Sequence, residues 1–232
     1  MKYVAGIDGS HAGWISVIRQ IDKENYYKLV FSKDLSSLCN DGINLALIDM
    51  PVGLDEKIES GGRIVDKLAR KKLIKRKSSI FNAPSRLTLK AKNYQEANKI
   101  NKKQGLGLSK QSWNLIPKIK EVEILMQQDN RPLIFESHPE IIFQEMGNKE
   151  LSYSKKEKSG IEERRKILEL NGFEIKFLNK YLQERNKNFK HDDFLDACAL
   201  SWSALRASKN KNKNIPEKGV KDEKGILMQM KI

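Results

Sequence analysis

The stretch YVAGIDGSHAGWISVIRQ (residues 3–20) decides the fold, because it places two apolar runs on either side of a very short turn. The runs YVAGID (3–8) and WISVIRQ (14–20) have the composition of β-strands, and the Gly-containing turn between them is too short for a parallel crossover. A third run, YYKLVFS (26–32), follows closely. We therefore expect the chain to begin with an antiparallel meander of three strands.

After the meander, apolar strands alternate with helices. The segment DLSSLCNDG (34–42) has the capping residues of a short helix, and LALIDMP (45–51) is continuously apolar, as in a strand covered on both faces. The clearest helix is HDDFLDACALSWSALRAS (191–208), because its apolar residues form one stripe. The tail (210–232) has the composition of a polar linker followed by a short terminal strand.

The stretch LIFESHPE (133–140) begins as a buried strand and turns polar at Glu136. Side chains alternate along a strand, so Glu136, His138 and Glu140 would project to the same side if the extended form persists, although Pro139 should stop the strand. The stretch therefore predicts a charged cluster at a sheet edge, which is either a solvated strand end or part of a site.

The order of the elements predicts an α/β protein with a ribonuclease-H-like mixed sheet. The meander is antiparallel, and the later strands should be parallel because helices separate them. The length of 232 residues suits one domain over residues 1–232, with a helical insertion over residues 62–130.

Composition narrows the range of partners and compartments. The formal net charge is +14, which favours a polyanionic partner such as DNA or RNA; the abundance of Lys, Asn and Ile is equally typical of an AT-rich coding sequence. The start, MKYVAGIDGS, has only a brief apolar run, so we expect neither a signal peptide nor a membrane span. Cys39 and Cys198 are isolated, which favours reduced thiols and a cytoplasmic location.

Carboxylates follow or open four of the predicted elements. Asp8 ends the first strand, Asp49 the fourth and Glu136 the fifth, while Asp193 and Asp196 share one face at the start of the last long helix. In an α/β sheet the carboxyl ends of parallel strands form the usual ligand crevice, so these side chains should converge there.

Converging carboxylates would repel one another unless a cation lay between them. Mg²⁺ and Mn²⁺ prefer oxygen ligands, and a pair of such ions about 4 Å apart can stabilise both the attacking and the leaving oxygen of phosphodiester cleavage. The pattern thus predicts metal ligands at Asp8, Glu136, Asp193 and Asp196, with Asp49 as a further catalytic carboxylate. His138 would be a proton carrier, although a structural histidine is the commoner case.

Each acid also has an ordinary structural explanation. Asp8 precedes Gly9 at a turn, and Asp49 precedes Met50 and Pro51 at another. Asp192 suits a helix N-cap, where acids also favour the helix dipole. The presence of acids at four separate element ends is more specific than any one of them.

Eight motifs stand in the order of a known family, and the resemblance covers nearly the whole chain. They are AGIDGSHAGW, IDMPVGL, RIVDKLARKKL, RKSSIFNAPSR, LSKQSWNLIPKIKEVE, FESHPEIIF, YSKKEKSGIEERRKIL and DDFLDACALSWSALRA. The chain resembles domain-of-unknown-function family 429, described as predicted ribonuclease-H-like nucleases. The resemblance implies this fold and, as an expectation, a nuclease activity.

The last helix also resembles that of Holliday-junction resolvases, which carry paired acids three residues apart. That resemblance implies that Asp193 and Asp196 match the pair, Asp8 the acid of the first strand, and Asp49 the acid of the fourth. The motif IDMP departs from the pattern, because it places Asp49 in a tight Pro turn where the resolvases tend to have Glu. Glu136 would then replace it as a ligand or contact the substrate.

The helical insertion and one later loop carry residues suited to substrate contacts. Arginines could hold phosphate, and Gln111 with Trp113 could bind and stack a base or another planar ring. We predict substrate contacts from Arg76, Ser78, Ser79, Arg86, Gln111, Trp113, Lys118 and Lys155. Trp113 equally suits a core position, and Lys155 lies in a basic loop, KKEKSG (155–160), that we expect to be flexible.

Three classes of function remain open from the sequence. The first is a metal-dependent nuclease. The second is a small-nucleotide phosphohydrolase or phosphotransferase: GIDGSHAG (6–13) resembles the first phosphate loop of sugar kinases and actin-like ATPases, but no second such loop follows. The third is a non-catalytic nucleic-acid or nucleotide-binding protein that keeps the fold.

Overall fold

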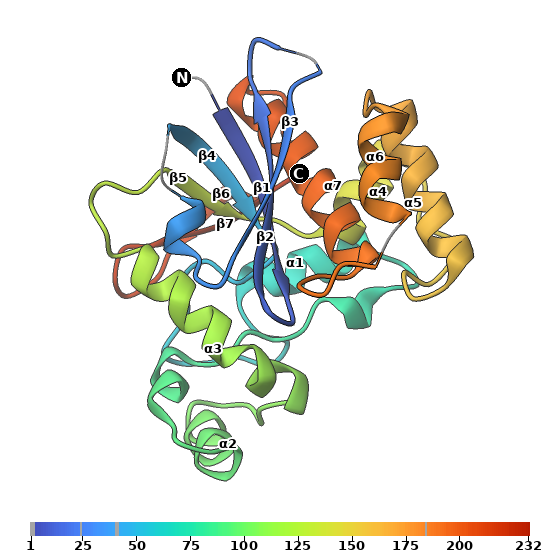
Figure 1. Ribbon diagram of the computed structural model, residues 1–232. Coiled ribbons are helices and arrows are strands. Elements are labelled where there is room, and N and C mark those ends of the chain that lie inside the picture. The colour runs from blue at the N-terminus through green and yellow to red at the C-terminus, as the bar shows by residue number, and fades with distance from the viewer. Residues whose placement is uncertain (1–2, 24, 40–41, 184) are drawn as a thin grey trace.

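The computed structural model describes residues 3–23, 25–39, 42–183 and 185–232. Within these ranges one seven-stranded sheet has the order β3-β2-β1-β4-β5-β7-β6 (Figure 1). Its strands are β1 Tyr3–Ser10, β2 Gly13–Gln20, β3 Tyr27–Ser32, β4 Ile43–Ile48, β5 Leu133–Glu136, β6 Asn214–Lys221 and β7 Leu227–Lys231.

The antiparallel meander is present as predicted. β1 pairs antiparallel with β2 from Tyr3 opposite Gln20 to Ser10 opposite Gly13, and β3 continues the meander on the far side of β2. β4 and β5 then add in parallel on the other side of β1. The predicted fold class, a ribonuclease-H-like mixed sheet, is thereby confirmed.

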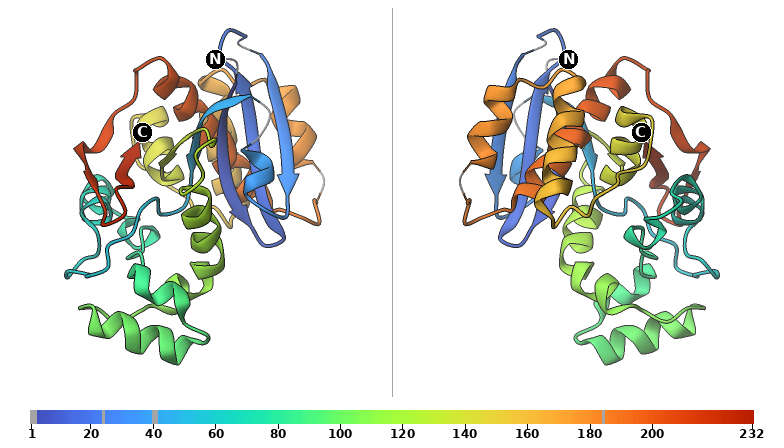
Figure 2. Two further views of the ribbon diagram at one scale, coloured as in Figure 1. Left: turned by 90° about the vertical axis from the view of Figure 1, so that its left-hand side faces the viewer. Right: turned by 90° about the vertical axis from the view of Figure 1, so that its right-hand side faces the viewer.

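Helices cover both faces of the sheet (Figure 2). One face packs against α7, which is backed by α4, α5 and α6, and the opposite face packs against α3 and the short 3-10 helix at Ser36–Leu38. The α-helices of the described residues are α1 Ile64–Lys72, α2 Tyr94–Lys103, α3 Lys110–Leu125, α4 Pro139–Gly147, α5 Lys158–Leu170, α6 Ile175–Leu182 and α7 His191–Ser208.

Alternate side chains of the central strands belong to two separate hydrophobic cores, one on each face of the sheet. Val4 and Leu47 point to the α7 face, whereas Ala5 and Ile7 point to the α3 face, and all four are fully buried. This two-sided burial explains why the strands of the sheet centre are almost continuously apolar.

Helix α7 approaches β1 unusually closely at Gly6. A Cβ at this position would overlap the backbone nitrogen of Ser201 and the carbonyl oxygen of Ala197, both of which belong to α7. Since Asp193 belongs to α7, this contact also determines where Asp193 lies relative to β1.

We expect Gly6→Ala to lower the free energy of unfolding by about 3 kcal/mol, because the overlap can be relieved only by moving α7 away from the sheet. Urea titration measures the change. Gly107→Ala is the matched control, since the atoms nearest to its added Cβ lie at 3.7 and 3.8 Å. Equal stability of the two variants would contradict the tight packing.

The structure differs from the sequence-based expectations in four places. The predicted polar linker of the tail contains strand β6, which pairs antiparallel with β7 at the sheet edge. Pro139 does not simply end a strand: it is the first residue of α4, where proline is favoured. Helix α6 was not predicted. In the segment 34–42 the described part forms a 3-10 helix, and residues 40 and 41 lie outside the described residues.

The segment between β4 and β5 contains both packed and projecting parts. Helix α1 packs near β6 and β7, whereas α2 and the beginning of α3 project from one end of the molecule (Figures 1 and 2). Cys39 and Cys198 are free and buried. Across the described ranges, no helix has the length and apolar character needed to cross a membrane.

Candidate active site

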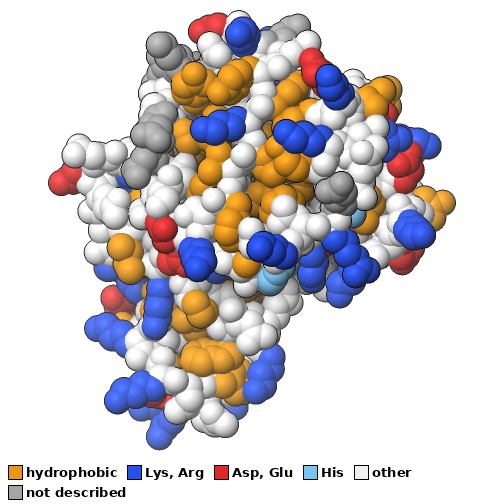
Figure 3. Space-filling model, in the orientation of Figure 1, with side chains coloured by type: hydrophobic (Ala, Val, Ile, Leu, Met, Phe, Trp, Pro, Cys, Tyr) orange, Lys and Arg blue, Asp and Glu red, His pale blue; other side chains and the backbone are white. Residues whose placement is uncertain are grey.

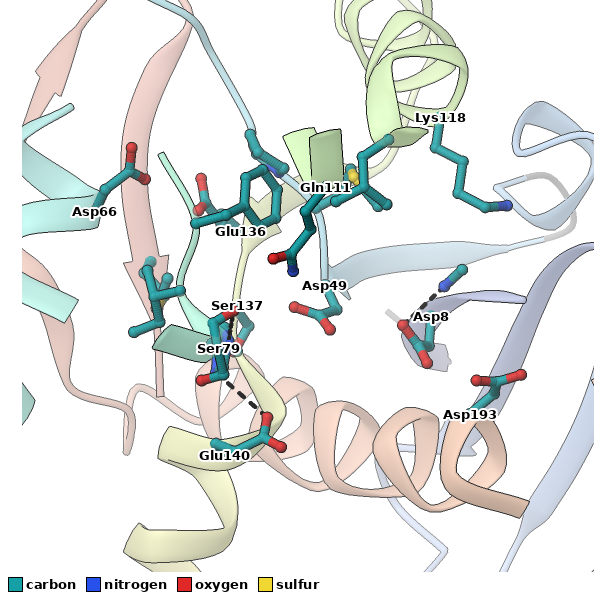
Figure 4. A pocket seen from close by; sticks show the side chains of 18 of the residues that line it. Asp8, Asp49, Asp66, Ser79, Gln111, Lys118, Glu136, Ser137, Glu140 and Asp193 are labelled. Carbon is teal, nitrogen blue, oxygen red and sulfur yellow. Dashed lines mark hydrogen bonds and ion pairs between the residues drawn. The ribbon is translucent and has the colours of Figure 1, made fainter. Parts of the chain in front are cut away.

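The carboxyl ends of β1, β4 and β5 open onto a pocket of about 310 Å³ (Figure 4). Because these three strands are parallel, the residues at their ends meet at one edge of the sheet. The sheet contributes Asp8, Asp49 and Glu136, and α7 contributes Asp193 from the adjoining side. Helix α3 closes the opposite side with Gln111, Leu115 and Lys118.

Asp8 is a buried acid surrounded by other carboxylates of the pocket. It is only 6% exposed, and its Oδ1 accepts a hydrogen bond from the Gly9 N–H at 2.8 Å. Burial raises the pKa of Asp8 well above its ordinary value, and the charges of Asp49, Asp196 and Asp193 raise it further, against the opposing charge of Lys155. Four of the predicted acids therefore lie close enough to influence one another.

Asp49 lies between Asp8 and Glu136 in the pocket (Figure 4). Its backbone N–H donates to the Ile7 carbonyl at 3.1 Å, which continues the β1–β4 ladder by one residue and fixes the start of the Pro turn. Burial raises the pKa of Asp49, while the charges of His138 and Lys155 oppose this. At both Asp8 and Asp49, therefore, the nearby positive charges do not fully offset the cost of burying a charged carboxylate.

The two acids of α7 have different surroundings. Asp193 lines the pocket and points toward Asp8 (Figure 4), and its Oδ2 also accepts from the Lys190 N–H at 2.9 Å, as in a helix capping box. Asp196, one turn further on, is fully buried behind the pocket lining, and Lys155 Nζ lies 2.8 Å from its Oδ2. The expectation that both acids face the crevice holds for Asp193 only.

Glu136 differs from a free metal ligand, because both its oxygens have protein partners. Arg63 Nη2 lies 2.9 Å from Oε1, and the Val52 N–H donates to Oε2 at 3.0 Å. Arg63 also pairs with Asp66 at 2.7 Å and donates to the Gly53 carbonyl at 2.8 Å. In this geometry Glu136 positions the wall of the pocket, and a role as ligand would require the Arg63 pair to open.

His138 remains on the pocket side of the chain, because its backbone is still extended before α4 begins. Its Nδ1 lies 3.7 Å from Glu140 Oε2, and its Nε2 lies 3.4 Å from the Ser79 carbonyl. Burial opposes ionisation of Glu140, but the charges of His138, Lys155 and Arg164 lower its pKa. Glu136, His138 and Glu140, the predicted cluster, all line the pocket, but Glu136 pairs with Arg63, and only His138 and Glu140 lie next to each other.

The eight predicted substrate contacts divide into two groups. Ser79, Gln111, Lys118 and Lys155 line the pocket. The other four lie outside it: Ser78 lines a neighbouring hollow, and the rest have structural partners. Arg76 donates to the Tyr153 carbonyl at 2.6 Å, Arg86 pairs with Glu123 at 2.9 Å and with Asp222, and Trp113 packs against the α3-side core.

The site also contains a residue that sequence reasoning missed. Arg63 lines the pocket and joins Asp66 to Glu136, which is 73 residues away in the sequence. The only local signal is Asp66 three residues after Arg63, which suits a helix start as well as an ion pair. Nothing in the sequence points to Glu136 as the third partner.

A family model described as Protein of unknown function (DUF429) matches residues 6–220, which includes every acid of the pocket. The chain belongs to the DUF429 family. Searches of the curated proteins and of the solved structures return no significant match.

The DUF429 pocket has donors of the kind that a hard divalent cation prefers. Asp8, Asp49 and Asp193 offer carboxylate oxygens whose mutual repulsion a cation would relieve. Within the part of the chain that is described, no three His, Cys, Asp or Glu side chains already stand in an arrangement that could hold an ion. The donor types suit Mg²⁺ or Mn²⁺, but their described positions do not form a coordination sphere, so binding would require these side chains to draw together.

Proposed function

We propose that this DUF429 protein is a metal-dependent nuclease that hydrolyses phosphodiester bonds of nucleic acid. The observation that carries the proposal is the convergence of Asp8, Asp49 and Asp193, from three separate elements, on one pocket. The negative charges of Asp49 and Asp193 disfavour the charged form of Asp8. Such an arrangement is expected where a bound cation offsets the repulsion between the carboxylates.

In this proposal Asp8, Asp49 and Asp193 hold Mg²⁺ or Mn²⁺, which would activate a water and polarise the phosphoryl group. His138 would move a proton, and its Nδ1 lies 3.7 Å from Glu140 Oε2, which can orient the ring. Lys118, which donates to the Gly13 carbonyl, lines the pocket next to Gly9 and neutralises substrate phosphate. Gln111 points its amide into the pocket, where it can bind a base edge (Figure 4).

The distribution of charge supports a nucleic acid as the substrate. The chain carries 44 Lys and Arg against 30 Asp and Glu, and basic side chains gather over the projecting α2 region (Figure 3). Lys99, Lys102 and Lys103 line a shallow hollow on α2. Such side chains bind phosphates without reading the base sequence, so they would guide a strand toward the pocket.

A small-nucleotide phosphohydrolase is the second candidate, and one observation favours it. Helix α3 forms a wall across the pocket with Gln111, Leu115 and Lys118, instead of leaving an open groove. The volume of about 310 Å³ is near the lower end of the range, about 300–1,000 Å³, that small-molecule sites occupy. A single nucleotide unit suits this space better than an intact duplex.

One assay separates the two candidates. Labelled single-stranded and double-stranded DNA and RNA, and free nucleoside mono- and triphosphates, are incubated with the purified protein in Mg²⁺, in Mn²⁺ or in EDTA. The nuclease proposal expects cation-dependent cleavage of a nucleic acid that EDTA abolishes. Hydrolysis confined to free nucleotides would support the second candidate, and no hydrolysis of any of these substrates by the folded protein would contradict both.

A further inference from the structure

Lys155 reaches into the acidic cluster from the segment between α4 and α5. Its Nζ lies 2.8 Å from Asp196 Oδ2 and 4.0 Å from Asp192 Oδ2, and the side chain also lines the pocket. The Asp196 side chain is completely buried, whereas that of Lys155 keeps 34% of its surface exposed. The ammonium group thus enters from the solvent side and meets a carboxylate that has no access to water.

The backbone just before Lys155 makes several hydrogen bonds in the structure. Arg76 holds the Tyr153 carbonyl at 2.6 Å, and the carboxylate of Glu163 accepts from the Ser152 N–H at 2.9 Å and the Tyr153 N–H at 3.1 Å. At Gly160 in α5 a Cβ would overlap the Ser154 carbonyl oxygen, so the loop rests directly on that helix. These contacts hold the backbone of residues 152–154, from which the Lys155 side chain extends toward Asp196.

Asp196 provides a second observation. Its Oδ1 is buried and, among the described residues, has no hydrogen-bond partner, so Lys155 is the main compensation that its charge receives. A buried carboxylate with one free oxygen is costly unless a cation faces it. Asp8 and Glu140 also act on Lys155, so the ammonium serves the whole cluster and not Asp196 alone.

Carboxylate clusters that cleave phosphodiesters often hold two divalent ions, one on each side of the reacting group. We propose that Lys155 Nζ permanently takes the place of one of these ions, so that the site binds a single divalent cation, at Asp8, Asp49 and Asp193. This inference rests on the proposed metal-dependent function for the identity of that single ion, but the role of Lys155 as a built-in cation can be tested without any substrate.

The test counts Mn²⁺ ions bound per chain by calorimetry and by the electron paramagnetic resonance signal of free Mn²⁺. The variants are Lys155→Met and, as a matched control, Lys156→Met, which removes the exposed neighbouring lysine. We expect one ion in the wild type and in Lys156→Met, and two in Lys155→Met. In EDTA the melting temperature of Lys155→Met should fall below that of the control, and Mn²⁺ should raise it again.

The double variant Lys155→Met with Asp196→Asn removes both charges, so it should bind one ion and recover stability in EDTA. If Lys155→Met does not fold in EDTA, refolding with and without Mn²⁺ gives the same test when Lys156→Met is measured alongside. Mn²⁺ should stabilise Lys155→Met more than it stabilises the control, whose single ion binds at Asp8, Asp49 and Asp193.

Two ions in the wild type, or the same count and the same Mn²⁺ response in Lys155→Met and Lys156→Met, would overturn the inference. An ion that binds only after Lys155 is removed would support the role of Lys155 while contradicting the proposed catalytic ion at Asp8. The two proposals can therefore fail separately.

Discussion

Replacing Arg63 with Met should lower the free energy of unfolding by about 3–5 kcal/mol, because the change leaves two buried carboxylates without their cation. The side chains of Arg63, Asp66 and Glu136 are 2%, 3% and 7% exposed. The guanidinium joins the start of α1 to the end of β5, so its loss should also loosen the pocket wall. Urea or thermal unfolding followed by circular dichroism measures the effect.

Arg165→Met is the matched control. Arg165 on α5 also contacts two carboxylates, Glu162 and Glu169, but the three side chains are between 20% and 46% exposed, so water screens the pairs and the loss should be within about 1 kcal/mol. Adding Glu136→Gln to Arg63→Met should recover part of the stability. If Arg63→Met lost no more than Arg165→Met, the buried ion pair would not support the fold as described.

Under the proposed function, Asp8→Asn should reduce the rate of phosphodiester hydrolysis at least about a thousandfold, because it would remove a charged ligand of the proposed ion, and such ions supply several kcal/mol of transition-state stabilisation. The same variant should be more stable than the wild type at pH 7. Since burial and neighbouring charges raise the pKa of Asp8, its charged form is the unfavourable one in the folded protein, and a neutral amide avoids that cost.

The gain in stability should depend on pH in a defined direction. Below the ordinary pKa of an aspartate, Asp8 is neutral in both the folded and the unfolded protein, so the variant and the wild type should be almost equally stable. The difference should grow as the pH rises from there toward the elevated pKa and should be constant above it. Asp22→Asn, at an exposed position in the turn after β2, is the control and should change neither rate nor stability. Loss of stability in Asp8→Asn without loss of activity would contradict both parts.

The sequence predicts the centre of the fold well, because local signals and tertiary structure agree there. The short turn between β1 and β2 permits only an antiparallel pair, and the apolar stripe of α7 matches a helix packed on a sheet. Prediction from the sequence is less successful at the edge of the sheet. Strand β6 is polar and contains Pro216, which is tolerated only because β6 lies at the sheet edge.

For the site, the positions of the acids could be predicted but their partners could not. Asp8, Asp49 and Asp193 stand at element ends, and the parallel order of the strands brings such ends together. Glu136 and Asp196 differ from these three acids because each has an ion-pair partner. Glu136 pairs with Arg63, which is 73 positions away, and Asp196 pairs with Lys155, which is 41 positions away. Such pairings depend on the packed arrangement of whole elements and leave no periodic trace in the sequence.

The most direct test of the acidic pocket as a cation-binding centre is a calorimetric titration with Mn²⁺, comparing the wild type with Asp8→Asn plus Asp193→Asn. Asparagine can still cap α7, so the double variant should fold. We predict saturable binding of one ion to the wild type and none to the double variant. Equal heats in the two folded proteins would contradict a cation site at these carboxylates, and with it the proposed mechanism.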